Sequence, residues 1–216
     1  RQRQMCIRDS PLYGRVLNPN YPVFVTGGSS SGSAAAVAAG LCYAALGTDT
    51  LGSVRLQAAY CGLVGFKPSY GRLSTTGIIS LHPELDVVGP ITHSVADSVH
   101  LMTQLAGWSL SVEQFPLNHL RWGVPDSFNR VELDFAVQQS FEIACAALSD
   151  LVRPRSVMLP RWDPGVLRRS GLLIAENHAA CYWTDPVSAY SEGLRSMLRY
   201  GREAPAGQLA LSLIHI

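Results

Sequence analysis

Two glycine-rich turns carry the residues of this chain that could do chemistry. The first reads Gly-Gly-Ser-Ser-Ser-Gly-Ser over residues 27–33, and the second reads Gly-Thr-Asp-Thr-Leu-Gly-Ser-Val-Arg over residues 47–55. Glycine lets the backbone adopt conformations that are closed to other residues, so each turn can present a hydroxyl beside backbone N–H groups. Ser29 and Ser53 in these turns therefore suggest a nucleophile and a partner for proton transfer.

Two other functions are open for the first turn. A glycine-rich loop before a helix can bind phosphate, but this loop lacks the Gly-Lys-Ser/Thr of a P-loop and the spaced glycines of a dinucleotide site. The segment 28–32 also fits the nucleophile elbow G-x-S-x-G, with Ser30 at its centre. That pattern is short, and it leaves the second turn unexplained.

The elements that must position these turns follow from the neighbouring residues. The β-branched and aromatic run at 23–26 predicts a strand that leads into the first turn. Residues 33–46 carry no charge, which predicts a helix over 33–41 that is buried on every side, and they are too few for a membrane span. A short strand at 43–46 should then deliver the second turn.

The two turns and the residues after them resemble the amidase signature family, a group of serine hydrolases that cut amide bonds with a Ser, cis-Ser, Lys triad. The matching residues are 27–30, 32–40, 46–50, 52–55, 58–59, 61–62, 65–69, 85–90 and 94–97. The resemblance is firm to about Gly107 and fainter to about Arg202. It implies an α/β fold with a mixed central sheet between helices, of which this chain holds a middle portion.

The resemblance also implies roles for single residues. Ser53 matches the nucleophile, and Ser29 matches the bridging serine whose preceding peptide bond is cis. The backbone N–H groups of Thr50, Leu51, Gly52 and Ser53 match the oxyanion hole. In this mechanism a neutral lysine is the final base, and an acyl-enzyme forms on the nucleophile.

The sequence departs from the family in its lysines. Lys67 is the only lysine, and it follows Ser53 in a segment that matches a scaffold turn, whereas the family's catalytic lysine lies many tens of residues before the first serine. We therefore expect this chain to be a fragment without amidase turnover. Two smaller departures are Leu51, where a glycine is usual, and Gln57, where a proline is usual.

Neighbouring polar residues have plainer interpretations. Ser30 and Ser31 are expected to be turn formers, and Ser30 is expected to support the site. Asp49 and Arg55 could contact substrate, but an ion pair that joins the two ends of the second turn is favoured. Cys61, among apolar neighbours, is expected to be an inert buried thiol.

The composition of the chain limits the kinds of partner that can be expected. The 216 residues are 47% hydrophobic and 15% charged, with a formal net charge of +1, so nothing predicts a nucleic-acid or membrane partner. The five widely spaced cysteines indicate free thiols in a reducing compartment, and we expect a cytoplasmic protein. We expect a small-molecule amide substrate, no metal and no cofactor, and a homodimer of the full-length parent is an open alternative.

Downstream residues predict further elements. A capping box at 94–97 should open a helix that ends at Gly107 and buries Val95, Val99, Met102 and Leu105. Helical spacing of Val137, Phe141, Ala144, Leu148 and Leu151 predicts a second core-facing helix. The remaining expected elements are a loop over 109–118, a strand over 120–124 closed by Pro125, and helices over 134–152, 167–183 and 188–200. Glu176 and His178 are interpreted as parts of a polar helical face.

Three questions stay open at this point: whether both ends of the chain are native, whether the chain associates, and which alternative function applies. Residues 1–10 and 209–216 are interpreted as non-native segments of the kind that adapter read-through leaves, with the partial domain over 11–208. Missing neighbours should leave open strand edges, so the isolated chain is expected to oligomerise or be poorly soluble. The alternative functions are the amidase-type subunit of a tRNA-dependent amidotransferase, which residues 74–81 do not resemble, and a non-catalytic scaffold.

Overall fold

The computed structural model is a mixed α/β structure, as the sequence predicts. Its described residues are 14–107, 121–125, 131–159, 163–183 and 190–215. They fall into two compact units, the first drawn from residues 1–110 and 172–209 and the second from residues 111–171 and 210–216. The predicted loop over 109–118 lies outside the described residues. Each unit is considered separately, and both serine turns belong to the first.

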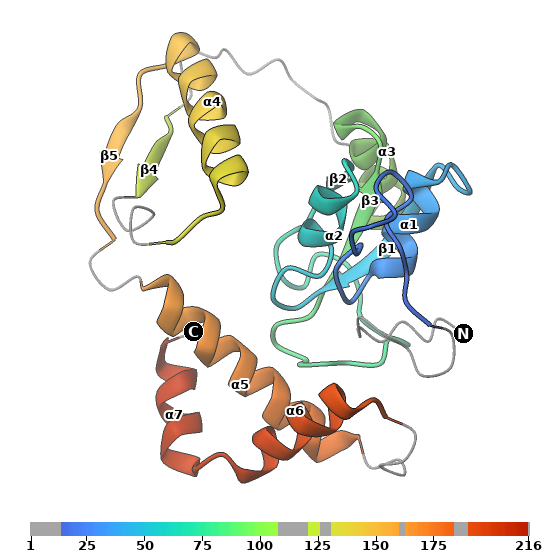
Figure 1. The fold of residues 1–216 in the computed structure, drawn as a ribbon, viewed down its shortest axis with the longest axis vertical. Helices are drawn as coiled ribbons and strands as arrows, with labels where there is room; N and C mark the ends of the chain where they lie inside the picture. The colour runs from blue at the N-terminus through green and yellow to red at the C-terminus, as the bar shows by residue number, and fades with distance from the viewer. Residues whose placement is uncertain (1–13, 108–120, 126–130, 160–162, 184–189, 216) are drawn as a thin grey trace. The chain divides into compact units, whose positions relative to one another are not determined.

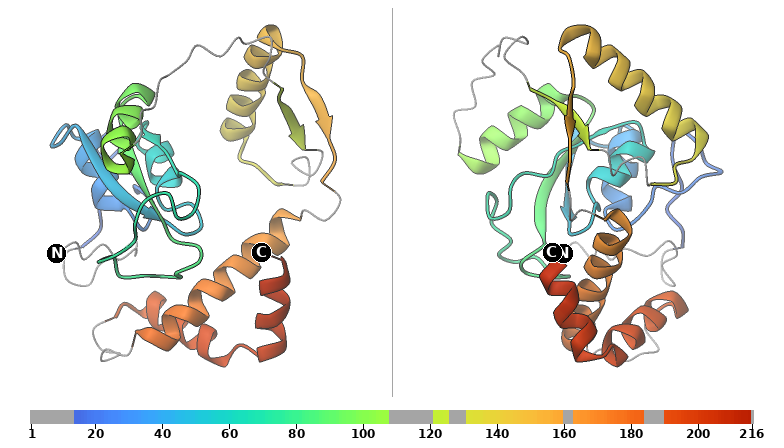
Figure 2. Two further views of the ribbon diagram at one scale, coloured as in Figure 1. Left: turned by 180° about the vertical axis from the view of Figure 1, so that it is seen from behind. Right: turned by 90° about the vertical axis from the view of Figure 1, so that its left-hand side faces the viewer.

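A three-stranded antiparallel sheet forms the centre of the first unit, with the order β1-β3-β2. β1 is Ala44–Asp49, β2 is Val64–Gly65 and β3 is Val87–Thr92. Every residue of β3 is buried. The expected strand at 43–46 begins one residue later and continues to Asp49, so it includes the first three residues of the second turn. Figures 1 and 2 show this sheet with helices packed around it.

Two short helices follow the two serine turns directly. α1 is Ser31–Ala38 and α2 is Arg55–Tyr60, so each serine of interest lies just before a helix. The helices share one apolar core with β3, and the buried members of this core are Ala34, Val37, Val54, Ala58, Cys61 and Ile91. This core fixes the two turns relative to each other. α1 ends earlier than the predicted range of 33–41, and α2 was not predicted.

Gly47 in β1 allows the first turn to approach the strand closely. A Cβ at this position would lie 2.5 Å from Ser30 Oγ and 2.9 Å from a methyl group of Val54. The first distance is far below an ordinary van der Waals separation, so a side chain here would displace Ser30. The contact between the first turn and β1 thus depends on the absence of a side chain.

The strand predicted at 23–26 is wrong, because this segment makes only a single bridge, between Leu17 and Val25. Asn18 explains the difference. It is 2% exposed, its N–H donates to Phe24 O, and its Oδ1 accepts from Tyr21 N at 3.3 Å, which folds the segment into a turn. Propensity favoured a strand here, but side-chain bonding to the backbone favours the turn.

Helix α3, Val95–Ala106, confirms the predicted capping box. Ser94 Oγ accepts from Asp97 N at 3.1 Å, and Gly107 ends the helix in a left-handed conformation with φ 65°. The helix packs against β2 and β3. Local capping chemistry therefore set both of its ends.

The predicted burial of two helices is largely wrong. In α3, Met102 is buried, but Val95 is 66% exposed and Leu105 is 43% exposed. Helix α4, Phe135–Leu151, spans the predicted range but has no buried residue. Its exposed apolar side chains include Val137, Phe141, Leu148 and Leu151. An apolar stripe is buried only where another element covers it, and the described residues supply no cover for these faces.

In the second unit, α4 lies alongside a two-stranded parallel sheet, as Figure 2 shows. β4 is Gly123–Pro125 and β5 is Arg155–Val157. Trp122 Nε1 donates to Val152 O at 2.6 Å, which joins the start of β4 to the end of α4. The predicted strand over 120–124 is thus shorter, and it includes the proline expected to close it.

Three helices complete the described chain: α5, Pro164–Tyr182; α6, Glu192–Glu203; and α7, Ala206–His215. The first two confirm predicted helices, and α7 was not predicted. α5 and α6 bury Ala179, Ala180, Leu194 and Leu198 against each other. Among the described residues, no helix has both the length and the apolar character needed to cross a membrane.

Candidate active site

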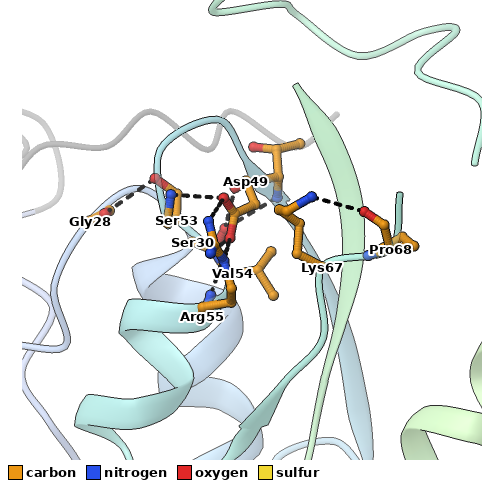
Figure 3. Close-up of polar contacts among 10 residues, drawn as sticks. Gly28, Ser30, Asp49, Ser53, Val54, Arg55, Lys67 and Pro68 are labelled. Atoms are coloured by element: carbon orange, nitrogen blue, oxygen red, sulfur yellow. Dashed lines mark hydrogen bonds and ion pairs between the residues drawn. The ribbon is translucent and has the colours of Figure 1, made fainter. Parts of the chain in front are cut away.

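The two serine turns meet at the N-terminal ends of α1 and α2. Ser53 Oγ donates to Gly28 O at 3.4 Å, and the peptide bond between Gly28 and Ser29 is cis, as the family resemblance implied. Figure 3 shows the Ser53 hydroxyl directed at this carbonyl. The Ser53 hydroxyl, which could act as nucleophile, therefore faces the peptide group that precedes Ser29.

Asp49 holds the turn that carries Ser53. The Asp49 side chain is fully buried, and its carboxylate accepts from the N–H groups of Gly52 at 2.7 Å, Val54 at 3.2 Å and Arg55 at 3.4 Å. The Arg55 guanidinium adds two bonds, from Nε at 2.9 Å and Nη2 at 3.0 Å. The predicted ion pair is confirmed, and Figure 3 shows it beside Ser53.

The ionisation of Asp49 follows from these contacts. Burial raises the pKa of this carboxyl, but the hydrogen bond and charge of Arg55, together with the N–H groups of Val54 and Gly52, outweigh burial and lower the pKa overall. The hydrogen bond that Arg55 donates to Asp49 likewise raises the pKa of Arg55. Asp49 is therefore a carboxylate at neutral pH, and it acts as a structural acceptor for the turn.

The predicted oxyanion donors are not equivalent in this structure. The Gly52 N–H donates to Asp49 Oδ1, so it is already engaged. Within the described part of the chain, the N–H groups of Leu51 and Ser53 have no hydrogen-bond acceptor. The Leu51 side chain is 41% exposed. The hydrogen bond of Thr50 to Asp86 uses its side-chain hydroxyl and not its N–H group, so among the described residues only the N–H of Gly52 is engaged out of the four predicted donors.

Ser30 is more than a turn former. It is 1% exposed, and its hydroxyl both accepts from Thr48 N and donates to Thr48 O, each at 3.3 Å. Ser33 Oγ makes a similar bond to Leu46 O at 2.8 Å. These serines join α1 to the outer edge of β1, so the Ser30 hydroxyl serves structure and does not support a nucleophile elbow. The sequence held no signal for this contact, because the partners lie in different elements.

Lys67, the only lysine, has no hydrogen bond to either serine among the described residues. Its Nζ donates to Pro68 O at 3.0 Å, as Figure 3 shows. Cys61 is 1% exposed and burial raises the pKa of its thiol, which supports the interpretation as an inert residue. No cluster of three or more potential metal ligands occurs among the described residues.

Gln57 and His178 depart from simple expectation. The Gln57 side chain is fully buried, and in the described part of the chain neither of its amide atoms has a partner. His178 was interpreted as part of a polar helical face. It is instead half-buried, its Nδ1 is 2.8 Å from Leu81 O, and its ring lies 5.0 Å from that of His82. His178 therefore joins α5 to the loop that precedes β3.

Known proteins resemble this chain in sequence and in fold. The sequence pattern of the Amidase family matches residues 4–161. The glutamyl-tRNA(Gln) amidotransferase A subunit of a Nitratiruptor species is 41% identical over 214 residues, which is 93% of this chain and 46% of that protein. The protein of the same name from Salinibacter ruber is 57% identical over 95 residues, or 44% of this chain and 18% of that protein.

Solved structures agree with the sequence relatives. The crystal structure of an amidase is 34% identical, with a TM-score of 0.85, over 97% of this chain and 48% of the other. The crystal structure of the glutamyl-tRNA(Gln) amidotransferase A subunit from Thermotoga maritima is 30% identical, with a TM-score of 0.68, over 92% of this chain and 45% of the other. The chain thus spans less than half the length of these relatives. Its sequence match and its fold both place the chain in the amidase signature family.

Proposed function

We propose that the full-length protein containing this chain cleaves the C–N bond of a small-molecule amide, with Ser53 as the nucleophile. One observation carries the proposal. The Ser53 hydroxyl meets the Gly28 carbonyl beside Ser29, in a turn whose backbone is fixed by the buried Asp49. The Ser53 hydroxyl thus lies at the peptide group next to Ser29, and we propose that a proton passes between the two serines.

The proposed reaction has two stages. Ser53 Oγ attacks the amide carbonyl carbon while its proton passes to Ser29, whose own proton passes to a base. The C–N bond then breaks, the nitrogen leaves with a returned proton, and water hydrolyses the Ser53 ester to a carboxylic acid. The N–H groups of Leu51 and Ser53 would stabilise the oxyanion, and such donors are typically worth about 3–4 kcal/mol each.

The base is the part of this mechanism that the chain does not supply. The resemblance implies a neutral lysine, and Lys67 donates to Pro68 O away from both serines. We propose that the base comes from a part of the parent protein outside this sequence. The chain alone is then inactive.

A second candidate function is favoured by the relatives. Several of the most similar curated proteins are named as A subunits of glutamyl-tRNA(Gln) amidotransferase, and one is 41% identical across 93% of this chain. In such a protein the amide nitrogen would be transferred within a complex rather than released. Residues 74–81 argued against this subgroup, but the overall similarity restores the candidate. A homodimer and a cytoplasmic location stay predictions.

The test of the proposal is covalent labelling of the full-length parent with a fluorophosphonate probe. We expect Ser53→Ala to abolish labelling and Ser29→Ala to slow it strongly, because the first removes the nucleophile and the second its proton acceptor. Ser74→Ala, at an exposed turn, is the matched control and should label like the wild type. Failure of a folded wild-type protein to label would contradict the proposal.

A second measurement separates the two candidates. The parent, together with its complex partners and a nucleoside triphosphate that can activate the acceptor carboxylate, is given an amide labelled with ¹⁵N, with and without glutamyl-tRNA(Gln). Hydrolysis predicts free labelled ammonia in both samples. Transfer predicts that the label enters the tRNA-bound aminoacyl group.

A further inference from the structure

We infer that Asp86 is a positioning residue for the nucleophile turn and acts through Thr50, an inference that rests on the proposed function of Ser53. Asp86 is 4% exposed and lies just before β3. Its Oδ1 accepts from Thr50 Oγ1 at 2.6 Å. A hydrogen bond to a carboxylate is among the stronger ones in proteins, so it fixes the side chain of Thr50 firmly.

The second carboxylate oxygen holds Asp86 itself in place. Asp86 Oδ2 accepts from Ser80 Oγ at 2.8 Å, Leu81 N at 2.8 Å and His82 N at 3.2 Å. With both oxygens bonded and almost no exposed surface, Asp86 has no room to act as a proton donor or acceptor for substrate. Its chemistry is therefore that of a fixed acceptor.

The sheet register explains why this acceptor reaches the turn. Asp49 in β1 pairs with Val87 in β3 at the end of the strand ladder. Thr50 and Asp86 are the next residue on each strand, so their side-chain bond continues the pairing one step into the turn. The sheet thereby determines where the turn begins.

Two buried carboxylates, Asp49 and Asp86, thus hold different parts of the turn. Asp49 binds the N–H groups of Gly52, Val54 and Arg55. Asp86 binds the side chain of Thr50. The segment between these fixed points contains Leu51 and Ser53, whose N–H groups have no acceptor in the described part of the chain. Loss of the Thr50 contact would let this segment shift, and small misplacements at a reacting centre lower rates strongly.

The experiment compares three variants of the full-length parent. Thr50→Val replaces the hydroxyl with a methyl group of similar shape and removes only the bond to Asp86 Oδ1. Thr50→Ser keeps the hydroxyl. Ser80→Ala removes a bond to the same carboxylate on the other oxygen, so it is the matched control.

The readouts are the rate of fluorophosphonate labelling and the separate values of kcat and KM. We expect Thr50→Val to slow labelling and lower kcat about tenfold while KM changes less than about twofold. Thr50→Ser should restore most of the rate, and Ser80→Ala should stay close to the wild type. A purely structural role would lower stability equally in Thr50→Val and Ser80→Ala without this difference in kcat.

The outcomes separate this inference from the function on which it rests. A wild-type protein that labels, together with a Thr50→Val variant that labels at the same rate, overturns the role of Asp86 alone. Equal losses in Thr50→Val and Ser80→Ala also overturn it. A folded wild-type protein that does not label contradicts the proposed nucleophile and the positioning role together.

Discussion

Gln57 has an unusual environment for an amide side chain. It lies four residues after Ser53, and its Nε2 would be 3.2 Å from a Cβ on Gly27, so its side chain faces the first turn. Neither its donor nor its acceptor has a partner among the described residues. An unsatisfied buried amide destabilises a fold, and the family's usual proline would carry no such group.

We predict that Gln57→Met makes the full-length protein more stable. Methionine has a similar length and no hydrogen-bonding amide, so the free energy of unfolding should rise by about 1–3 kcal/mol. Chemical denaturation of the two proteins measures this directly. Gln57→Ala is the control, because it removes the amide but leaves a cavity that offsets the gain. A less stable methionine variant would mean that Gln57 is hydrogen-bonded in the whole protein.

The sequence revealed single residues unevenly. Ser29 and Ser53 could be selected because a glycine directly precedes each of them and a family pattern fixes their spacing. Thr50 and Asp86 could not be paired in advance, since they are 36 residues apart and their contact depends on the register of β1 and β3. A side-chain role that arises from tertiary contact has no local signal.

The turn between β1 and α2 should lose stability under acid conditions. The contacts of this turn lower the pKa of Asp49 in the folded protein. The ionised Asp49–Arg55 pair therefore stabilises the fold at pH values above 3.8, the ordinary pKa of an aspartate. This stabilisation is lost as the pH falls below that value, towards the lower pKa of the folded state. The turn should therefore weaken only under acid conditions.

We predict that Asp49→Asn lowers the free energy of unfolding by about 1.5–3 kcal/mol at neutral pH, because bonds to a charged acceptor are lost. The difference from the wild type should shrink as the pH falls below 3.8. Denaturation at a series of pH values from 7 to 3 would measure it. Glu84→Gln, at an exposed carboxylate, is the control. A difference that stayed constant over this range would contradict the assigned ionisation.

Elements with strong local signals were predictable, and those that depend on neighbours were not. The ends of α3 followed from Ser94 and Gly107, because capping is a property of adjacent residues. The strand at 23–26 failed because Asn18 turns the chain back. The burial of α4 failed because a helical apolar stripe indicates only that a partner is needed, not that one is present.

At the scale of the whole molecule, many large apolar side chains of the described residues are exposed. Tyr43 is 95% exposed, Val23 is 83% exposed and Leu41 is 80% exposed. The chain spans less than half the length of the relatives compared above. Extensive exposed apolar surface commonly indicates a missing contact with another part of a protein or with a partner. The open edge of β1 is partly satisfied, because the hydroxyls of Ser30 and Ser33 bind backbone groups on its outer side. This edge should therefore contribute less to association than the apolar side chains do.

We predict that the isolated 216-residue chain self-associates or precipitates, because these apolar side chains would be shielded from water by contact between copies. Size-exclusion chromatography with light scattering should show a mass above that of one chain, increasing with concentration. The full-length parent is the control and should give a single defined species. A monodisperse monomer that unfolds in one cooperative transition would contradict this expectation.

Gly47 has a consequence for how this region can vary. Even the methyl group of alanine would overlap with Ser30 Oγ, and Ser30 in turn bonds to both backbone groups of Thr48. Glycine should therefore be required at position 47 as strictly as serine is at positions 29 and 53, although it has no side chain that could take part in the reaction. Natural variants and laboratory libraries should both show this. Substitution at position 47 is limited only by the space that Ser30 leaves.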